Sequence, residues 1–147
     1  MEFAAQIGLY TQCYMYHDDD KVTGKPIRLF HGIADDLTSI EPGRAYVERL
    51  KAAGVDVALT GYPDTYHSYD FFWRKEPFKF PQLPTDRNCP LVEGDGGQLL
   101  NGKTGKPFDR NLCMEKEVTG AYSNEEATVA TTIAVKEFLV ATFHLKQ

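Results

Sequence analysis

The sequence predicts an α/β fold with a short, mainly parallel sheet, flanking helices and a β-hairpin insertion. The first observation is a strand, helix and strand succession over residues 27–60, because a crossover of this length places its two strands parallel in one sheet. The second is an apolar run over residues 4–10, which supplies a further strand. The third is a helical pattern over residues 123–144, which supplies a second helix.

The crossover unit has clear boundary signals. Residues 27–30 are apolar and rich in strand-forming types, as expected of a buried strand. Ser39 is suited to cap the following helix, apolar residues then recur at helical spacing, and Gly54 lies where a C′ glycine belongs. The second strand covers residues 55–60.

Each strand of this unit leads into a turn with a titratable side chain. Asp35 follows the first strand and His67 follows the second, so both are expected at the carboxyl edge of the sheet, where sites form. A carboxylate that accepts the imidazole Nδ1 proton leaves Nε2 to take a proton from a nucleophile. The alternative is ordinary: a surface aspartate and a loop histidine without a common role.

The stretch HGIADDLTSI (31–40) and the stretch YPDTYHSYD (62–70) resemble the acid turn and histidine turn of α/β-hydrolases in the dienelactone-hydrolase-like family. The resemblance implies a partial α/β-hydrolase fold with Asp35 as the catalytic acid and His67 as the catalytic base. Asp36 is the alternative acid, because only one of two adjacent carboxylates can face the imidazole. The resemblance implies a structural role for His31.

A nucleophile is missing from this pattern. Such hydrolases carry it on a strained turn, G-x-S-x-G or its cysteine version, and no such motif occurs in the sequence. The serines lie at caps or directly after the base, and the cysteines lack flanking glycines: Ser39, Ser68, Ser123, Cys13, Cys89 and Cys113. We therefore expect a truncated hydrolase-like protein that is inactive alone. The alternative is an ester or lactone hydrolase whose nucleophile comes from another segment or chain.

The region after the base, residues 71–118, is expected to be an insertion between the core (residues 1–70) and the closing helix of one domain. It opens with closely spaced aromatic residues, which we expect to pack under a long loop; the alternative is an apolar acyl or lactone pocket. Several prolines exclude a regular helix or central strand.

Residues 97–104 of this insertion satisfy the letter pattern of a phosphate-binding P-loop, GxxxxGKT. A P-loop must open a helix, and Gly105 and Pro107 follow at once. A hairpin with tips at residues 95–96 and 101–102 is the better interpretation. Nucleotide binding is not expected.

Cys89 and Cys113 bracket this hairpin and either form a disulfide or remain reduced. Reduced thiols are favoured, because no signal-peptide pattern is present and a third cysteine is left over. No cofactor is expected. The polar run His17 to Asp20 is interpreted as a solvated loop and not as a metal site.

The closing helix has a capping-box pattern at Ser123 and should pack back on the sheet. Its expected buried face is the stripe of Ala127, Ala130, Ala134, Phe138 and Ala141.

Composition limits the partners. The chain has 147 residues and a net charge of −5 with both signs mixed, which disfavours nucleic-acid binding. No apolar run is long enough for a membrane span, and a cytoplasmic location is expected. A parallel sheet cut in half exposes an unpaired edge, so we expect a homo-oligomer formed through that edge. A small ester or lactone is the expected ligand.

Overall fold

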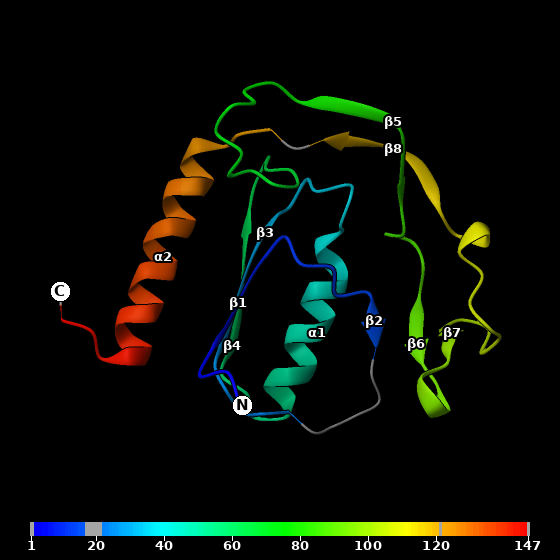
Figure 1. The fold of residues 1–147 in the computed structure, drawn as a ribbon, viewed down its shortest axis with the longest axis horizontal. Helices are drawn as coiled ribbons and strands as arrows, with labels where there is room; N and C mark the ends of the chain where they lie inside the picture. The colour runs from blue at the N-terminus through cyan, green and yellow to red at the C-terminus, as the bar shows by residue number, and fades with distance from the viewer. Residues whose placement is uncertain (1, 17–21, 121, 147) are drawn as a thin grey trace.

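A computed structural model describes residues 2–16, 22–120 and 122–146 of the chain. Its central sheet has the order β1 (Gln6–Leu9), β3 (Ile27–Gly32) and β4 (Val57–Tyr62), with both pairs parallel (Figure 1). The α/β architecture and the parallel sheet are confirmed. The observed strands differ from the expected ranges by one or two residues at most ends.

Helix α1 (Ile40–Ala52) connects β3 to β4 and covers one face of this sheet. The Ser39 side chain accepts a hydrogen bond from the Glu41 amide, and Gly54 has a φ of +81°, so both expected boundary residues are confirmed. The core between helix and sheet is an aliphatic cluster of Ile27, Leu29, Val47, Leu50, Val55 and Val57.

Helix α2 (Glu125–Phe143) lies on the opposite face of the sheet (Figure 1). Because side chains alternate along a strand, Arg28 points away from the α1 core and lies 4.7 Å from the centre of the Phe138 ring of α2. The Thr131 hydroxyl lies 2.8 Å from the Tyr69 hydroxyl and donates to the Tyr62 hydroxyl at 3.0 Å. The expected packing of this helix on the sheet is therefore confirmed.

Two details of α2 differ from expectation. Its N-cap is Asn124, whose side chain accepts from the Ala127 amide, and not Ser123. The expected stripe is wrong in part, because Ala130 and Ala141 are exposed while Thr131 is buried. The hydroxyl of Thr131 is buried because it bonds to tyrosine hydroxyls, and a pattern of apolar residues does not predict such hydrogen bonds.

No helix in the described ranges is long and apolar enough to cross a membrane.

The segment that follows His67 forms one small sheet by itself and a second one together with β2. Strands β5 (Phe78–Thr85) and β8 (Glu115–Gly120) make an antiparallel ribbon with an irregularity between Phe80 and Pro84. A two-stranded ribbon consists only of edges, which is where prolines are tolerated in strands. The second small sheet contains β2 (Met15–Tyr16), β6 (Leu91–Glu93) and β7 (Leu99–Asn101).

The predicted hairpin is confirmed. Strands β6 and β7 are antiparallel and joined through the 3-10 turn η1 (Asp95–Gly97); a second short turn, η2 (Arg110–Leu112), precedes β8. After β7 the Asn101 side chain accepts the amides of Lys103 and Thr104, and Gly105 has a φ of +66°. A tight turn thus occupies the place where a P-loop would begin its helix.

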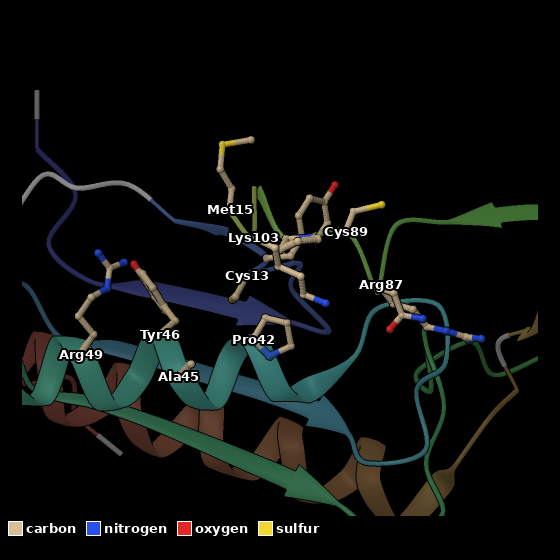
Figure 2. A pocket seen from close by; sticks show the side chains of 12 residues that line it. Cys13, Met15, Pro42, Ala45, Tyr46, Arg49, Arg87, Cys89 and Lys103 are labelled. Carbon is tan, nitrogen blue, oxygen red and sulfur yellow. The ribbon is translucent and has the colours of Figure 1, made fainter. Parts of the chain in front are cut away.

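Cys89 and Cys113 form a disulfide, so the expectation of reduced thiols is wrong. The ribbon and hairpin bring their Cα atoms within 5.2 Å although 24 positions separate them in sequence, a closeness that spacing alone does not reveal. Disulfides persist in oxidising compartments. The disulfide is unusual for a cytoplasmic protein. The cytoplasmic location stays a prediction. Cys13 keeps a free thiol and lines one cavity together with Cys89 (Figure 2).

The aromatic residues after His67 do not pack under a loop as expected. Tyr69 is buried, but the side chains of Phe72 and Trp73 are 78% and 65% exposed, and Phe71 and Phe78 are also exposed. They stack on one another instead, with 4.9 Å between the ring centres of Phe71 and Trp73. The alternative of an acyl or lactone pocket stays a prediction.

Candidate active site

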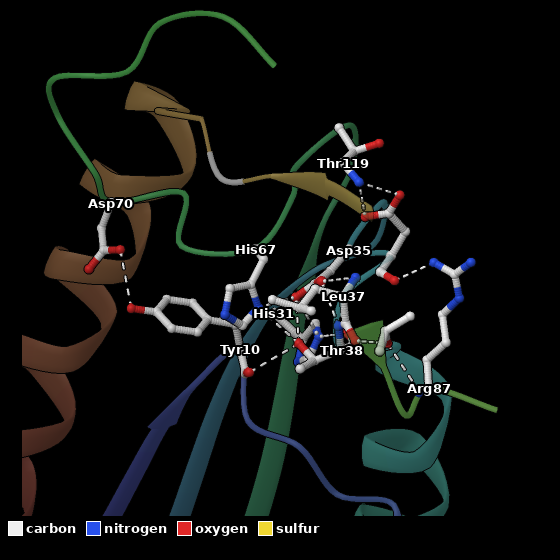
Figure 3. Close-up of polar contacts among 11 residues, drawn as sticks. Tyr10, His31, Asp35, Leu37, Thr38, His67, Asp70, Arg87 and Thr119 are labelled. Atoms are coloured by element: carbon white, nitrogen blue, oxygen red, sulfur yellow. Dashed lines mark hydrogen bonds and ion pairs between the residues drawn. The ribbon is translucent and has the colours of Figure 1, made fainter. Parts of the chain in front are cut away.

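Asp35 and His67 meet at the carboxyl edge of the sheet, as the sequence predicts. Asp35 lies in the turn after β3 and His67 in the loop after β4, and Nδ1 of the imidazole is 2.9 Å from Oδ2 of the carboxylate (Figure 3). Two neighbouring parallel strands end at the same level, so their following loops are adjacent. The fold therefore produces the pair directly.

The Asp35 carboxylate is buried and receives hydrogen bonds at both oxygens. Oδ1 accepts the amides of Leu37 at 3.0 Å and Thr38 at 2.8 Å, while Oδ2 accepts the Thr38 hydroxyl at 2.7 Å. Burial by itself raises the pKa of Asp35, but hydrogen bonds from His31, His67 and Thr38 outweigh it and hold that pKa well below its usual range. The carboxylate is therefore ionised at neutral pH.

His31 is buried and supports the acid turn from β3. Its Nε2 lies 2.7 Å from the Thr38 carbonyl oxygen and 3.3 Å from Oδ2 of Asp35. This position beneath the carboxylate agrees with the structural role implied for it. Sequence alone did not indicate which atoms it contacts.

Gly32 allows the acid turn and the histidine loop to approach closely. A Cβ at this position would lie 2.1 Å from the Thr65 carbonyl oxygen, which accepts the Ala34 amide at 3.0 Å. Any side chain here would push the two loops apart. The backbone contact between these loops thus requires glycine directly after His31.

The His67 imidazole lies between the buried carboxylate and solvent. Its side chain is 20% exposed, whereas that of Asp35 has no exposed surface. Among the described residues none hydrogen-bonds Nε2, and the described part of the chain has no buried side-chain nitrogen without a partner. It follows that Nε2 reaches solvent, which is the position a general base requires.

Tyr10 and Thr38 complete the surroundings of His67, and sequence reasoning missed both. The Tyr10 ring centre is 4.7 Å from the imidazole centre, and the Tyr10 carbonyl oxygen lies 3.2 Å from the Thr38 hydroxyl oxygen. That hydroxyl also lies 3.0 Å from Nδ1 of His67. Tyr10 directly follows β1, the third strand that ends at this edge. The only available signal was its place after a predicted strand.

Asp36, the alternative acid, has a different partner. Its two carboxylate oxygens accept the Thr119 amide of β8 at 2.9 and 2.8 Å, and its carbonyl oxygen accepts the Arg87 guanidinium. Of the two adjacent carboxylates, only Asp35 has a recorded bond to the imidazole. Thr85 at the end of β5 donates to the Leu37 carbonyl oxygen at 2.6 Å, so the ribbon holds the acid turn at a further point.

Of the serines set aside as nucleophiles, Ser39 has a hydroxyl that accepts the Glu41 amide as a helix cap. The Thr38 hydroxyl lies 3.0 Å from Nδ1 of His67. No group of three or more metal-ligating side chains that could hold an ion occurs in the described residues. His17 to Asp20 lie outside the described residues.

Comparison of the chain with known protein families, with curated proteins and with solved structures found no match. The carboxylate and imidazole pair, with one nitrogen held and the other open to solvent, is therefore the basis for assigning a chemistry to this site.

Proposed function

We propose that this chain is an α/β-hydrolase-like protein, similar to dienelactone hydrolases, that contains the acid Asp35 and the base His67 but no nucleophile, and that alone it does not perform serine-type acyl transfer through an acyl-enzyme. The observation that carries the proposal is the 2.9 Å contact between the buried Oδ2 of Asp35 and Nδ1 of His67. A surface aspartate and an unrelated loop histidine would not share a desolvated contact of this kind.

The chemistry follows from the two ends of the imidazole. An ionised Asp35 holds the proton on Nδ1, so Nε2 has a lone pair and accepts a proton. The same carboxylate stabilises the imidazolium that forms. A nucleophile hydroxyl or thiol placed beside Nε2 would be activated for attack on an ester or lactone carbonyl. In its absence, only water can be activated there.

A second candidate function is an ester or lactone hydrolase that works when another segment or chain supplies the nucleophile. The solvent-facing Nε2 favours it, because acid and base already have a working arrangement. The outer edge of β1 also favours it, since within the described strands β1 pairs only with β3. A strand added there would end beside the loop of Tyr10, on the same edge as His67.

The test measures hydrolysis of a panel of p-nitrophenyl esters by the purified chain, with fluorophosphonate labelling followed by mass spectrometry. We expect slow hydrolysis without a labelled serine, reduced to the buffer rate by His67→Ala. The matched control is His144→Ala, at an exposed helix end, which should keep the rate.

A labelled serine would show that the chain has its own nucleophile and would refute the first candidate. A rate that His67→Ala leaves unchanged would refute the proposed base. Restoration of fast, label-sensitive turnover on mixing with a chain that carries a nucleophile would favour the second candidate.

A further inference from the structure

A cavity of about 520 Å³ lies between α1 and the small sheet of β2, β6 and β7 (Figure 2). Neither Asp35 nor His67 lines it. Pro42, Tyr46 and Arg49 face it from one side of α1, at a spacing of about one and two helical turns. Its volume is within the range of cavities that hold small molecules. The cavity is thus distinct from the candidate active site.

The walls are mostly flat or apolar. Side chains from three parts of the chain enclose the space: Tyr14, Met15, Pro42, Ala45, Tyr46 and Pro90. Rings and prolines with few freely rotating groups favour a flat ligand, because little side-chain entropy is lost when it binds. An aromatic body therefore suits this space better than a flexible chain.

Among the residues that the structure describes, the charged side chains that line the cavity are all cationic. They are Arg49, Arg87 and Lys103. Arg87 is partly neutralised by Glu115 at 2.8 Å, whereas Lys103 has no ion pair with any described residue. Arg49 lies over the Tyr46 ring, 5.5 Å from its centre. The described lining thus carries three cationic side chains, although the chain as a whole has a net charge of −5.

The turn that carries Lys103 is held rigidly against the cavity wall. Asn101 Oδ1 accepts the Lys103 amide at 2.9 Å, and the Gly102 amide donates to the Pro90 carbonyl oxygen at 2.8 Å. Pro90 directly follows Cys89 of the disulfide. The P-loop letter pattern, which does not form a P-loop, therefore forms a tight turn that presents a lysine at this cavity.

We propose that this cavity binds a small aromatic carboxylate, with the ring between Tyr46 and Pro90 and the carboxylate at Lys103. Arg87 and Arg49 add positive potential around the anion. A neutral analogue of equal shape would keep the apolar contacts and lose the charge interaction. The proposal is independent of the hydrolase assignment, because the catalytic pair is not part of the cavity.

The test titrates 2-naphthoate and its neutral analogue 2-naphthalenemethanol into the whole chain, followed by calorimetry and by amide chemical shifts. We expect the carboxylate to bind about tenfold more tightly, a difference that decreases at high salt. Shifts should concentrate at the α1 face and at the turn of Lys103. Lys103→Gln should weaken naphthoate about fivefold and leave the alcohol unchanged.

The matched control is Lys51→Gln, which removes an exposed lysine of the same α1 helix that pairs with Glu48. It should leave naphthoate affinity unchanged, and Tyr46→Ala should weaken both compounds. Equal affinity for acid and alcohol, shifts that lie elsewhere, equal effects of the two lysine variants, or no binding of naphthoate would each overturn the proposal. Amide spectra without ligand establish that each variant is folded.

Discussion

Replacing Asp35 by asparagine should destabilise the protein far more than the same change at the adjacent Asp36. In Asp35→Asn the amide oxygen can still accept the two backbone amides at Oδ1. The amide nitrogen, however, would replace Oδ2, which lies 2.7 Å from the Thr38 hydroxyl, 2.9 Å from His67 and 3.3 Å from His31. The two hydrogen-bond donors to this charged oxygen, the Thr38 hydroxyl and His67 Nδ1, would then face a further donor, while His31 Nε2 keeps its bond to the Thr38 carbonyl oxygen.

The magnitude follows from the strength of bonds to ionised groups. A hydrogen bond to a charged acceptor contributes about 1.5 to 3 kcal/mol, against about 1 kcal/mol for a neutral one. The loss is thus about 1 kcal/mol for each of the two donors at Oδ2, or about 2 kcal/mol in total. Asp36→Asn keeps a side-chain oxygen that can accept the backbone amide of Thr119, and should cost below about 1 kcal/mol.

The assay is urea unfolding followed by circular dichroism, where Asp35→Asn should lower the midpoint by about 1 M. Nitrogen NMR of His67 adds an independent readout. The native chain should have its imidazole proton on Nδ1, and the variant should have it on Nε2, because the new amide donates to Nδ1. Equal midpoints for the two variants, or an unchanged tautomer in Asp35→Asn, would refute the assignment of Asp35 as the orienting acid.

Three further predictions concern the disulfide, acid and the sheet edge. Removing the disulfide with Cys89→Ala and Cys113→Ala should cost about 3 to 4 kcal/mol for a loop of 24 positions, while Cys13→Ser should cost far less in the same urea assay. Burial raises the pKa of Asp35 but its hydrogen bonds lower it further, so the unfolded chain is protonated there first as pH falls. The contribution of Asp35 to the free energy of unfolding should therefore be fully present above about pH 4 and be lost below it. Acid should consequently lower the free energy of unfolding less in Asp35→Asn than in the native chain. Light scattering after size exclusion should show that the native chain is a homo-oligomer. The Gln6 amide donates toward β3, so the amide of the next residue, Ile7, is expected to face the open edge of β1. Ile7→Pro removes that amide and should give a monomer. A native chain that is monomeric at all concentrations would contradict the edge-pairing hypothesis.

The parallel sheet and the meeting of Asp35 with His67 were predictable because their signals are local. A capping serine, helical spacing and Gly54 mark one crossover helix, and the handedness of such crossovers leaves one arrangement of the two strands. Once the strands are parallel, the turns that follow them must be neighbours. The position of the pair therefore required no knowledge of distant contacts.

The remaining parts of the site depend on contacts that sequence patterns do not encode. The Thr119 amide reaches Asp36 across 83 positions, and Thr85 reaches the Leu37 carbonyl oxygen across 48. Both residues are threonines in strands, and nothing in the residue type or in the neighbouring sequence distinguishes them from other strand residues. The disulfide was missed for the same reason, since its two cysteines come together only after β5, β8 and the hairpin have formed.

These distant contacts attach the insertion to the turn that carries Asp35. The acid turn receives a hydroxyl from Thr85 at the end of β5, a guanidinium from Arg87 and an amide from Thr119 of β8. All three bond to Asp36 or Leu37, the two residues directly after Asp35, on the side away from the imidazole. In the proposed chemistry, a carboxylate in a turn fixed at so many points would not need to reorganise as an imidazolium forms, and such preorganisation would stabilise that imidazolium. The ribbon is therefore the outer support of the candidate site, and the disulfide that closes it stabilises the same support.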